Sequence, residues 1–513
     1  MAKLLEDAEN AASVDVDARR QVGGRDSSRF VRRLYFSIAF VAVAGVCFYV
    51  SNLSRPPSFL PEVMIGSTTS TTVQFRAVYV YDLPPRFRNA GRGADCLSLH
   101  CTFGGPPQVH FGIELWKSRQ FEWPWMVYNR LLNSSQRTRD LQEAEVFVIP
   151  AFRVAFGVPC AERKDLVASL CERNPLLCSE QPELQKQRVQ VARRHILLDA
   201  RVAHEKCSYM WDLNEPLKHF TRLSLEVTNG GPYAQEFNWE KPWKWYAFPY
   251  PSFYHGPGAK APAVTRPRGQ AKFLWSYFGT GRGQAGLLRS MLKKECNASE
   301  RCWLPTAPAD TSYNKSSLVD RQFENDADLM QRAVSSYLDS TFCAQPPGDT
   351  ASRKGIIDSI VFGCVPVLFA VQQLTLWEAH FTRAEFESLV VLVPEPMIVG
   401  VNSTGLSDWA RASVDLGFGK WTQHIPPMDL KQRWDQLGLA GTPWQYMKTN
   451  STFTTPRPLT QQLAAITEVE LRQKQEALAA LAPRVILALT DGERDALHIL
   501  LERVILDAEA AAD

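Results

Sequence analysis

Two cations and a carboxylate follow a tight turn in residues 342–369, FCAQPPGDTASRKGIIDSIVFGCVPVLF. Arg353 and Lys354 come after the Pro-Pro-Gly-Asp turn, and Asp358 follows Lys354 by four positions. The helical spacing of the apolar residues from Ser352 onward places both cations in a first helical turn, where the dipole disfavours them by about 0.3 to 1 kcal/mol each. A bound anion would reverse that cost, and helix-start amides commonly bind phosphate. The stretch predicts a diphosphate site, with Asp358 placed to accept hydrogen bonds from ribose hydroxyls.

A second glycine loop supports this interpretation. The GTGRG stretch at 279–283 follows a strand-like run and contains Arg282, and Arg289 lies on the amphipathic segment after it. Each feature also has a simpler interpretation. Arg353 and Lys354 can be a solvated helix face with Asp358 paired to one of them, and a lone GxGxG is more often only a tight turn.

The elements that must position these residues alternate between strand and helix. AVYVYDLPPRF (77–87), AEVFVIPAF (144–152) and KFLWSYF (272–278) read as strands, and helix-like segments follow the first and the third. This alternation predicts an α/β fold. The Pro- and Gly-rich segment 255–269 predicts a domain boundary, and the chain beyond Pro456 is helix-forming.

An N-terminal apolar segment predicts a membrane anchor. Residues 34–54 contain no charged residue, and about 20 mostly apolar residues suffice to cross a bilayer. Several arginines lie just before this apolar segment. The amino end is therefore expected to stay cytoplasmic and the bulk of the chain to be lumenal. A cleaved signal peptide is the competing interpretation. The net charge of +3 is small for 513 residues and indicates no nucleic-acid partner.

Cysteines and sequons agree with a lumenal chain. Of 11 cysteines, Cys47 lies in the apolar segment and ten follow it. The close pairs are Cys96 with Cys101, Cys171 with Cys178, and Cys296 with Cys302. Cys343 and Cys364 sit in apolar runs, where buried free thiols are as reasonable as a disulfide. Candidate N-glycosylation sites are Asn133, Asn297, Asn314, Asn402 and Asn450.

The 342–369 stretch closely resembles the nucleotide-sugar-binding segment of exostosin-type glycosyltransferases, glycosyltransferase family 47. Its P-P-G-D and paired cations look most like the plant xyloglucan galactosyltransferase branch. VYVYDLPPRF, VYNRLLNSSQRTRDLQEAEVFVIPAF, FPYPSFYH, LLRSMLKKECNASERC and the closing ALAPRVILA and DALHILLERVI segments are similar to family motifs in the same order. The resemblance therefore extends through most of the chain after the apolar segment.

The resemblance implies a GT-B fold, in which two Rossmann-like domains face a cleft, preceded here by one transmembrane helix. The expected parts are a cytoplasmic tail (1–33), the transmembrane helix (34–54), a stem (55–74), an acceptor-side domain (75–265), a nucleotide-sugar-binding domain (266–455) and C-terminal helices (456–513). It also implies inverting transfer from a UDP-sugar, with galactose favoured, to a polysaccharide or glycan hydroxyl. The protein would be a single-pass type II protein of the Golgi membrane.

Site residues carry over by position. Gly348, Arg353, Lys354, Asp358 and Arg289 match the donor-side motifs, and Arg353 and Arg289 are assigned to the diphosphate. A single displacement needs a general base near the acceptor hydroxyl. Asp82 and His255 lie in matched segments of the first domain and are the candidates, although either can be structural. No metal or other cofactor is expected.

Some features depart from the family pattern. The family's Gly-Arg-Asp-His-Phe stretch has no clear counterpart, His219 lying in the nearest segment, and residues 158–208 look like an insertion. A non-catalytic subunit that supports another Golgi transferase is therefore the alternative function. The Asp-Ala-Asp at 326–328 imitates the metal site of GT-A enzymes, but it is more typical of a helix start.

Overall fold

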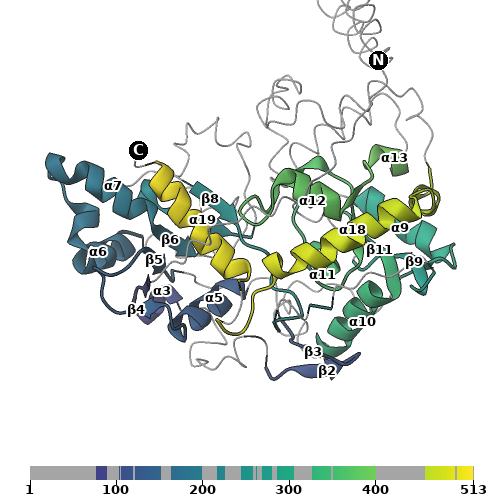
Figure 1. The fold of residues 1–513 in the computed structure, drawn as a ribbon, viewed down its shortest axis with the longest axis horizontal. Coiled ribbons are helices and arrows are strands. Elements are labelled where there is room, and N and C mark those ends of the chain that lie inside the picture. The colour runs from purple at the N-terminus through teal and green to yellow at the C-terminus, as the bar shows by residue number, and fades with distance from the viewer. Residues whose placement is uncertain are drawn as a thin grey trace, which may run out of the picture. The chain divides into compact units, whose positions relative to one another are not determined.

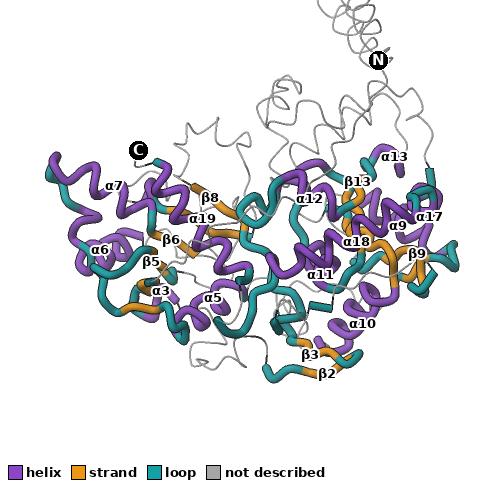
Figure 2. The backbone as a smooth tube through the Cα atoms, in the orientation of Figure 1, coloured by secondary structure: helices purple, strands orange, loops and turns teal. Residues whose placement is uncertain are grey.

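The computed structural model describes residues 77–88, 103, 105–118, 122–151, 163–198, 217–225, 244–257, 261–262, 269–279, 286–304, 326–347, 351–399, 457–491 and 494–511. All of them belong to the unit that runs from Gln74 to Asp513. Their helices and strands are shown in Figure 1, and Figure 2 separates them by type. The predicted tail, apolar segment and stem at 1–74 lie outside the described residues.

The first sheet has six strands, all parallel, in the order β4-β1-β5-β6-β7-β8. Its central strands, Val-Phe-Val-Ile in β5 and His-Ile-Leu-Leu in β6, are buried at every position. Such continuous burial is typical of parallel sheets covered on both faces. The strands are β1 (Val78–Val80), β4 (Arg137–Thr138), β5 (Val146–Ile149), β6 (His195–Leu198), β7 (Thr221–Ser224) and β8 (Lys244–Ala247).

Helices α5 (Trp123–Leu132) and α7 (Gln185–Arg193) pack on this first sheet, α5 against β1 and α7 against β6. The short α3 (Pro85–Arg88) follows β1, and α6 (Arg163–Arg173) lies in the crossover from β5 to β6. The prediction that residues 158–208 are an insertion relative to the family stays a prediction, and the described part of that range contributes elements to the first sheet. Helices α6 and α7 form a βαβ connection, and β6 is a central strand paired with β5 and β7.

The second sheet has five strands, also all parallel, in the order β10-β9-β11-β12-β13. They are β9 (Phe273–Ser276), β10 (Cys302–Trp303), β11 (Ser340–Gln345), β12 (Val365–Leu368) and β13 (Val391–Leu392). The helices along this part of the chain are α9 (Gly286–Asn297), α10 (Asp326–Asp339), α11 (Lys354–Val361), α12 (Arg383–Leu389) and α13 (Pro396–Val399). Helix α10 thus begins at the Asp-Ala-Asp segment.

The C-terminal helices contact both sheets. Helix α17 (Leu459–Ala464) packs on β9, and α18 (Glu468–Leu481) packs on β12 and α12. Helix α19 (Ala496–Ala510) instead packs on β5 and α7 of the first sheet, as its yellow ribbon shows in Figure 1. The tail therefore passes from one sheet to the other, and the chain after Pro456 is helical as predicted where it is described.

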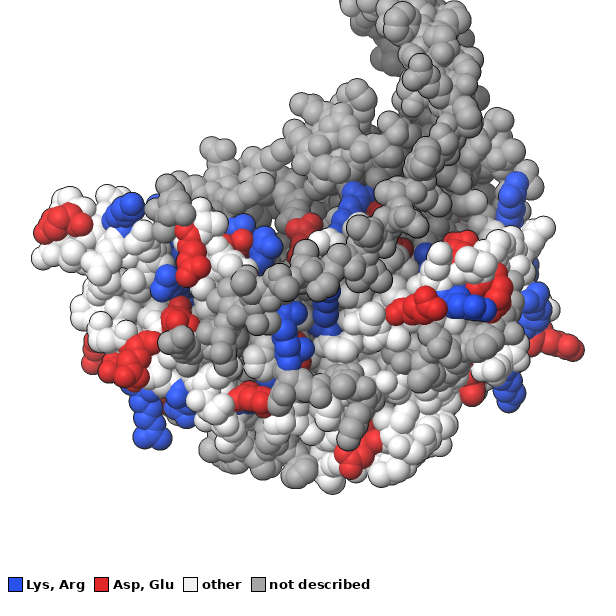
Figure 3. Space-filling view, viewed as in Figure 1, with Lys and Arg blue, Asp and Glu red and all other residues white. Residues whose placement is uncertain are grey.

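Two parallel sheets with helices between their strands confirm the α/β part of the predicted fold class, and the arrangement is compatible with the two Rossmann-like domains of a GT-B fold. A separate antiparallel hairpin joins β2 (Gln108–His110) and β3 (Ile113–Leu115). Among the described residues, no helix is both long enough and apolar enough to cross a membrane. On the face in Figure 3, the cationic and anionic side chains of the described residues are interspersed.

Candidate functional site

The candidate site lies where β9 and β11 end. These strands are parallel neighbours, with Phe342 opposite Trp275, so their carboxyl ends meet at one edge of the second sheet. Tyr277, Phe278 and Gly279 continue from β9. The Pro346–Pro347 turn continues from β11. Ligands of open α/β sheets bind at such strand ends.

Arg353 is held at this edge by backbone carbonyls. It precedes helix α11 as its N-cap, with an extended backbone (φ −151°, ψ 140°). Its Nη1 donates to the carbonyl of Pro346 (3.0 Å) and its Nη2 to the carbonyl of Phe278 (3.2 Å). The guanidinium therefore bridges the ends of β11 and β9, and the side chain is half-buried rather than a solvated helix face.

Arg289 reaches the same turn from helix α9. Its Nε and Nη2 both donate to the carbonyl of Pro347, at 3.0 and 2.7 Å, and the residue is only 6% exposed. Because Pro346 and Pro347 are adjacent, the two arginines assigned to the diphosphate meet at one turn. A guanidinium has five N–H donors in a rigid fork, which suits phosphate oxygens.

Lys354, which is mostly buried, pairs with the fully buried Asp358 one turn later on α11. The Nζ of Lys354 lies 2.9 and 3.0 Å from the two carboxylate oxygens of Asp358. Burial lowers the pKa of Lys354 and raises that of Asp358, and the attraction between the two opposes both changes. This is the pairing that the simpler interpretation expected, although the pair is buried rather than solvated. The role of Asp358 toward a ribose stays a prediction.

The same pair contacts a segment of the first half of the chain. The amide of Phe253 donates to Asp358 Oδ1 (3.3 Å), and Lys354 Nζ lies 3.5 Å from the centre of the Phe253 ring. The hydroxyl of Tyr250 lies 2.9 Å from Ser352 Oγ. The FPYPSFYH segment therefore packs on the start of α11, which gives this motif a structural role beside Ser352 and Lys354.

Gln373 ties the strand-end loops together, and sequence reasoning missed it. Its Nε2 donates to the carbonyls of Gln345 (3.0 Å) and Ala351 (3.2 Å). Its Oε1 accepts from the amides of Phe369 (3.0 Å) and Ala370 (3.1 Å). A fully buried amide with four backbone partners fixes the loop around Arg353. The only local signal was a polar residue inside the apolar run LFAVQQLTLW.

The candidate base His255 is buried and bonded at both ring nitrogens. Its Nδ1 lies 2.7 Å from the carbonyl of Leu487, so Nδ1 carries the proton and Nε2 accepts from Ser118 Oγ at 2.5 Å. Burial lowers its pKa to about 3, and the charge of Lys354 adds to the lowering. The ring also meets Phe103 and Trp116 edge-on. These contacts hold the ring in one orientation, and its catalytic role stays a prediction.

The remaining predicted residues fall in different places. Asp82 follows the carboxyl end of β1 in the first sheet and is exposed. Arg282 and Gly348 lie outside the described residues. Asn133 and Asn297 are exposed at the ends of helices α5 and α9, whereas Asn314, Asn402 and Asn450 lie outside the described residues. Among the described residues, no group of three or more His, Cys, Asp or Glu side chains is arranged to hold a metal ion.

Three disulfides are present in the described part of the chain. Cys171–Cys178 and Cys296–Cys302 are the two close pairs that the sequence singled out. The third, Cys343–Cys364, joins β11 to the residue before β12. Sequence reasoning left these two cysteines undecided, because their strands had to be placed side by side first. Cys96 and Cys101 lie outside the described residues.

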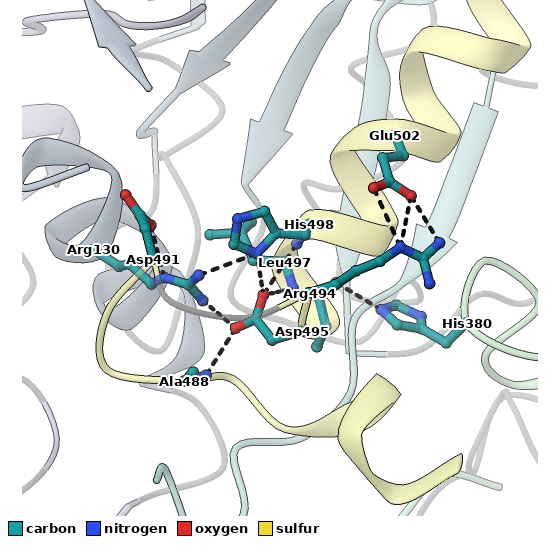
Figure 4. A network of polar contacts seen from close by, with 10 residues as sticks. Arg130, His380, Ala488, Asp491, Arg494, Asp495, Leu497, His498 and Glu502 are labelled. Atoms are coloured by element: carbon teal, nitrogen blue, oxygen red, sulfur yellow. Dashed lines mark hydrogen bonds and ion pairs between the residues drawn. The ribbon is translucent and has the colours of Figure 1, made fainter. Parts of the chain in front are cut away.

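A buried polar network fastens helix α19 to the first sheet (Figure 4). Arg130 of α5 donates to Asp495, which caps α19 by accepting from the amides of Leu497 (3.1 Å) and His498 (3.2 Å). Burial alone would raise the pKa of Asp495, but the hydrogen bond from His498 and the charge of Arg130 outweigh it, and the pKa is lowered. Arg130 lies in the VYNRLLNSS motif, which thus has an architectural role.

Two parallel sheets with arginines gathered at a strand-end turn define an α/β protein with a cationic site. Residues 73–404, more than half of the chain, match the exostosin GT47 domain, and the chain belongs to that family. This membership confirms the resemblance and places the chain among the glycosyltransferases.

Similar proteins come from Arabidopsis thaliana. A probable xyloglucan galactosyltransferase GT19 is 26% identical over 62% of this chain and 70% of its own length. Xyloglucan galactosyltransferase MUR3 is 25% identical over 66% of this chain and 55% of its own length. A xyloglucan-specific galacturonosyltransferase 1 is 24% identical over 57% of this chain and 44% of its own length. Against the last two, the chain spans about half of the relative.

Proposed function

We propose that the protein is an inverting glycosyltransferase with a GT-B fold that moves a sugar, with galactose favoured, from a UDP-sugar to a polysaccharide or glycan hydroxyl. The observation that carries this proposal is the pair of arginines, Arg289 and Arg353, bound to the adjacent carbonyls of one strand-end turn. Their placement suits a diphosphate leaving group, which gains negative charge as the glycosidic bond to it breaks.

The chemistry follows from a single displacement. The acceptor hydroxyl loses its proton to a base while its oxygen attacks the anomeric carbon, and the bond from that carbon to the UDP oxygen breaks. Arg289 and Arg353 stabilise the departing diphosphate, so no metal is required by this scheme. Asp82 and His255 are the proposed bases. Lys354 and Asp358 hold the start of α11 against the segment around Phe253.

The donor sugar and the acceptor are proposed from the relatives. Their names pair xyloglucan with galactosyl transfer in two cases and with galacturonosyl transfer in the third. Small changes in the donor pocket can change which nucleotide sugar a member of one family uses. We therefore place UDP-galactose first and UDP-galacturonic acid second, with xyloglucan as the first acceptor to test.

The proposed location is the Golgi lumen, with residues 34–54 as a type II membrane anchor. Three disulfides in the described residues favour an oxidising compartment. The apolar segment and the arginines before it support the orientation. Partners would be the UDP-sugar, the glycan acceptor, the membrane and other Golgi transferases.

The test is binding and turnover of a UDP-sugar panel by the full-length chain, purified from a eukaryotic host in detergent, beside its Arg353→Ala variant. A preferred donor that the parent binds and the variant loses supports the proposal and names the sugar. Absence of UDP binding by the folded parent contradicts it, and then the non-catalytic subunit becomes the better description.

A further inference from the structure

Tyr277 lies between the two arginines of the candidate donor site. It follows strand β9 directly and is completely buried. Its hydroxyl oxygen accepts a hydrogen bond from Arg353, and the charges of Arg353 and Arg289 both act on it. Burial raises the pKa of Tyr277, and the two cations oppose that change only in part. The hydroxyl therefore stays protonated and neutral beside two positive charges.

Gly279 provides the space that this contact needs. A Cβ atom at position 279 would lie 2.9 Å from the Tyr277 hydroxyl oxygen and 3.0 Å from Arg353 Nη2. Real Cβ atoms essentially never approach another atom as closely as 2.9 Å, and 3.0 Å is tighter than nine in ten real contacts, so any side chain at this position would shift the hydroxyl or the guanidinium. The backbone of Gly279 thus lies against both the hydroxyl and the guanidinium.

Arg353 consequently has three protein anchors on one edge of the sheet. Two are the carbonyls of Pro346 and Phe278, and the third is the Tyr277 hydroxyl. The two carbonyls hold the guanidinium of Arg353 in place. The Tyr277 hydroxyl lies beside Gly279, near Nη2 of that guanidinium. A guanidinium held in one rotamer loses less conformational freedom when it binds an anion.

We propose that Tyr277 is a positioning residue of the donor site, holding the guanidinium of Arg353 ready for the diphosphate, and that Gly279 is required to leave it room. The inference rests on the proposed function, because the diphosphate of a UDP-sugar is the ligand. Tyr277 acts through Arg353 and does not itself contact the diphosphate. It extends the site to a residue that the donor motif does not contain.

The test compares UDP with uridine, which lacks the diphosphate. Full-length parent and Tyr277→Phe are titrated with UDP by calorimetry and with uridine by saturation-transfer NMR. Because the lost hydrogen bond acts through Arg353 and not on UDP itself, only part of its strength is expected to appear in UDP binding, which weakens about 5- to 20-fold while uridine binding is unchanged. Tyr81→Phe is the matched control, because it removes a buried hydroxyl that pairs with His195 in the first sheet, 2.8 Å away.

A double-mutant cycle separates positioning from a general loosening of the fold. In the Arg353→Ala background, Tyr277→Phe is expected to cost no further UDP affinity, since the group it positions is gone. Gly279→Ala places a methyl group against the Tyr277 hydroxyl and Arg353 Nη2. It is expected to disturb their contact and to lower UDP affinity by a similar factor. Melting temperatures report whether each variant is folded.

The outcomes are distinguishable. Equal UDP affinity of parent and Tyr277→Phe overturns the inference and leaves the proposed function standing. Parallel loss of UDP and uridine, or additive losses in the cycle, also overturns it by showing a purely structural role. A folded parent that binds neither ligand overturns the proposed function, and the inference with it.

Discussion

Arg289 and Arg353 donate hydrogen bonds to the carbonyls of two consecutive residues, Pro347 and Pro346. The arginines come from different helices, α9 and the start of α11, and are 64 positions apart in the sequence. The Pro346–Pro347 segment therefore contacts both cations. Because each proline fixes its own φ near −65°, the two carbonyls are displayed with little freedom.

The first prediction concerns these two cations. Arg289→Ala and Arg353→Ala are each expected to weaken UDP binding about 10- to 100-fold, since each removes a charged donor from the diphosphate. Arg353→Lys is expected to restore little of the UDP affinity that Arg353→Ala loses, because an ammonium cannot bridge the Pro346 and Phe278 carbonyls as a forked guanidinium does. Calorimetric titration of the full-length chain measures the effect. Unchanged UDP affinity in both alanine variants would remove the diphosphate assignment.

The second prediction separates two roles of Asp358. Asp358→Asn leaves Lys354 buried without its counter-charge and is expected to destabilise the fold by about 3 to 5 kcal/mol. Replacing both residues, Lys354→Met with Asp358→Leu, is expected to recover most of that loss. Chemical denaturation measures both free energies of unfolding.

A binding experiment tests the ribose role of Asp358. If Asp358 binds the ribose, Asp358→Asn loses the preference for UDP over 2′-deoxy-UDP, and an unchanged preference would contradict the ribose assignment.

The third prediction tests the proposed bases. Loss of a general base is expected to lower kcat about 100- to 10,000-fold while donor affinity is kept. His255→Ala and Asp82→Asn are compared for turnover and for UDP binding. Ser118→Ala is the control, because it removes a hydrogen-bond partner of His255 and keeps the ring. Parental turnover in both variants would place the base elsewhere.

The fourth prediction concerns stability against pH. Burial lowers the pKa of His195 to about 3, so between about pH 6.5 and 3 the unfolded chain binds a proton that the folded chain does not. Stability therefore falls on acidification below pH 6.5, by up to about 1.4 kcal/mol per pH unit for one such group. His255 and His380, with pKa values of about 3 and 4, act in the same direction.

Carboxyls whose pKa values are raised by burial oppose this trend. Burial raises the pKa of Glu395 to about 7. The contribution of Glu395 to the free energy of unfolding is therefore complete below pH 4.5 and is lost as the pH rises through 7. The pKa values of Asp358, Glu378 and Asp507 are also raised, with desolvation as the first cause of each. Because only Glu395 among these carboxyls reaches about 7 whereas three histidine pKa values fall to about 3 to 4, we expect a net loss of stability from pH 6.5 to 5. Melting temperatures across that range measure it, and His195→Phe, which keeps the stack between Phe147 and Phe220, is expected to flatten the slope. An identical slope in the variant would contradict this account.

The fifth prediction concerns the Cys343–Cys364 disulfide. It closes a loop of sequence separation 21 that contains the Pro-Pro turn and Arg353. Cys343→Ala with Cys364→Ala is expected to lower the free energy of unfolding by about 3 kcal/mol. Non-reducing peptide mapping checks the bond itself, and denaturation of the variant checks its contribution. Free thiols at both positions in the purified full-length protein would contradict it.

Local features of the sequence predicted much of the site. The apolar spacing after Ser352 indicated helix α11, and the strand-like runs indicated β1, β5 and β9, because these signals depend only on neighbouring residues. Motifs in a fixed order indicated the family. The domain boundaries and the roles of Asp82, His255 and the sequons at 314, 402 and 450 stay predictions.

The sequence by itself determined the fold class, the family and the place of the cations at a helix start, because propensity, periodicity and motif order are local. Only the tertiary structure decided which groups those cations meet. The contact of Asp358 with Phe253 joins residues 105 positions apart, and Cys343 meets Cys364 only because β11 and β12 pair in parallel. Such partners follow from strand order and from the burial of charge, which no single segment encodes.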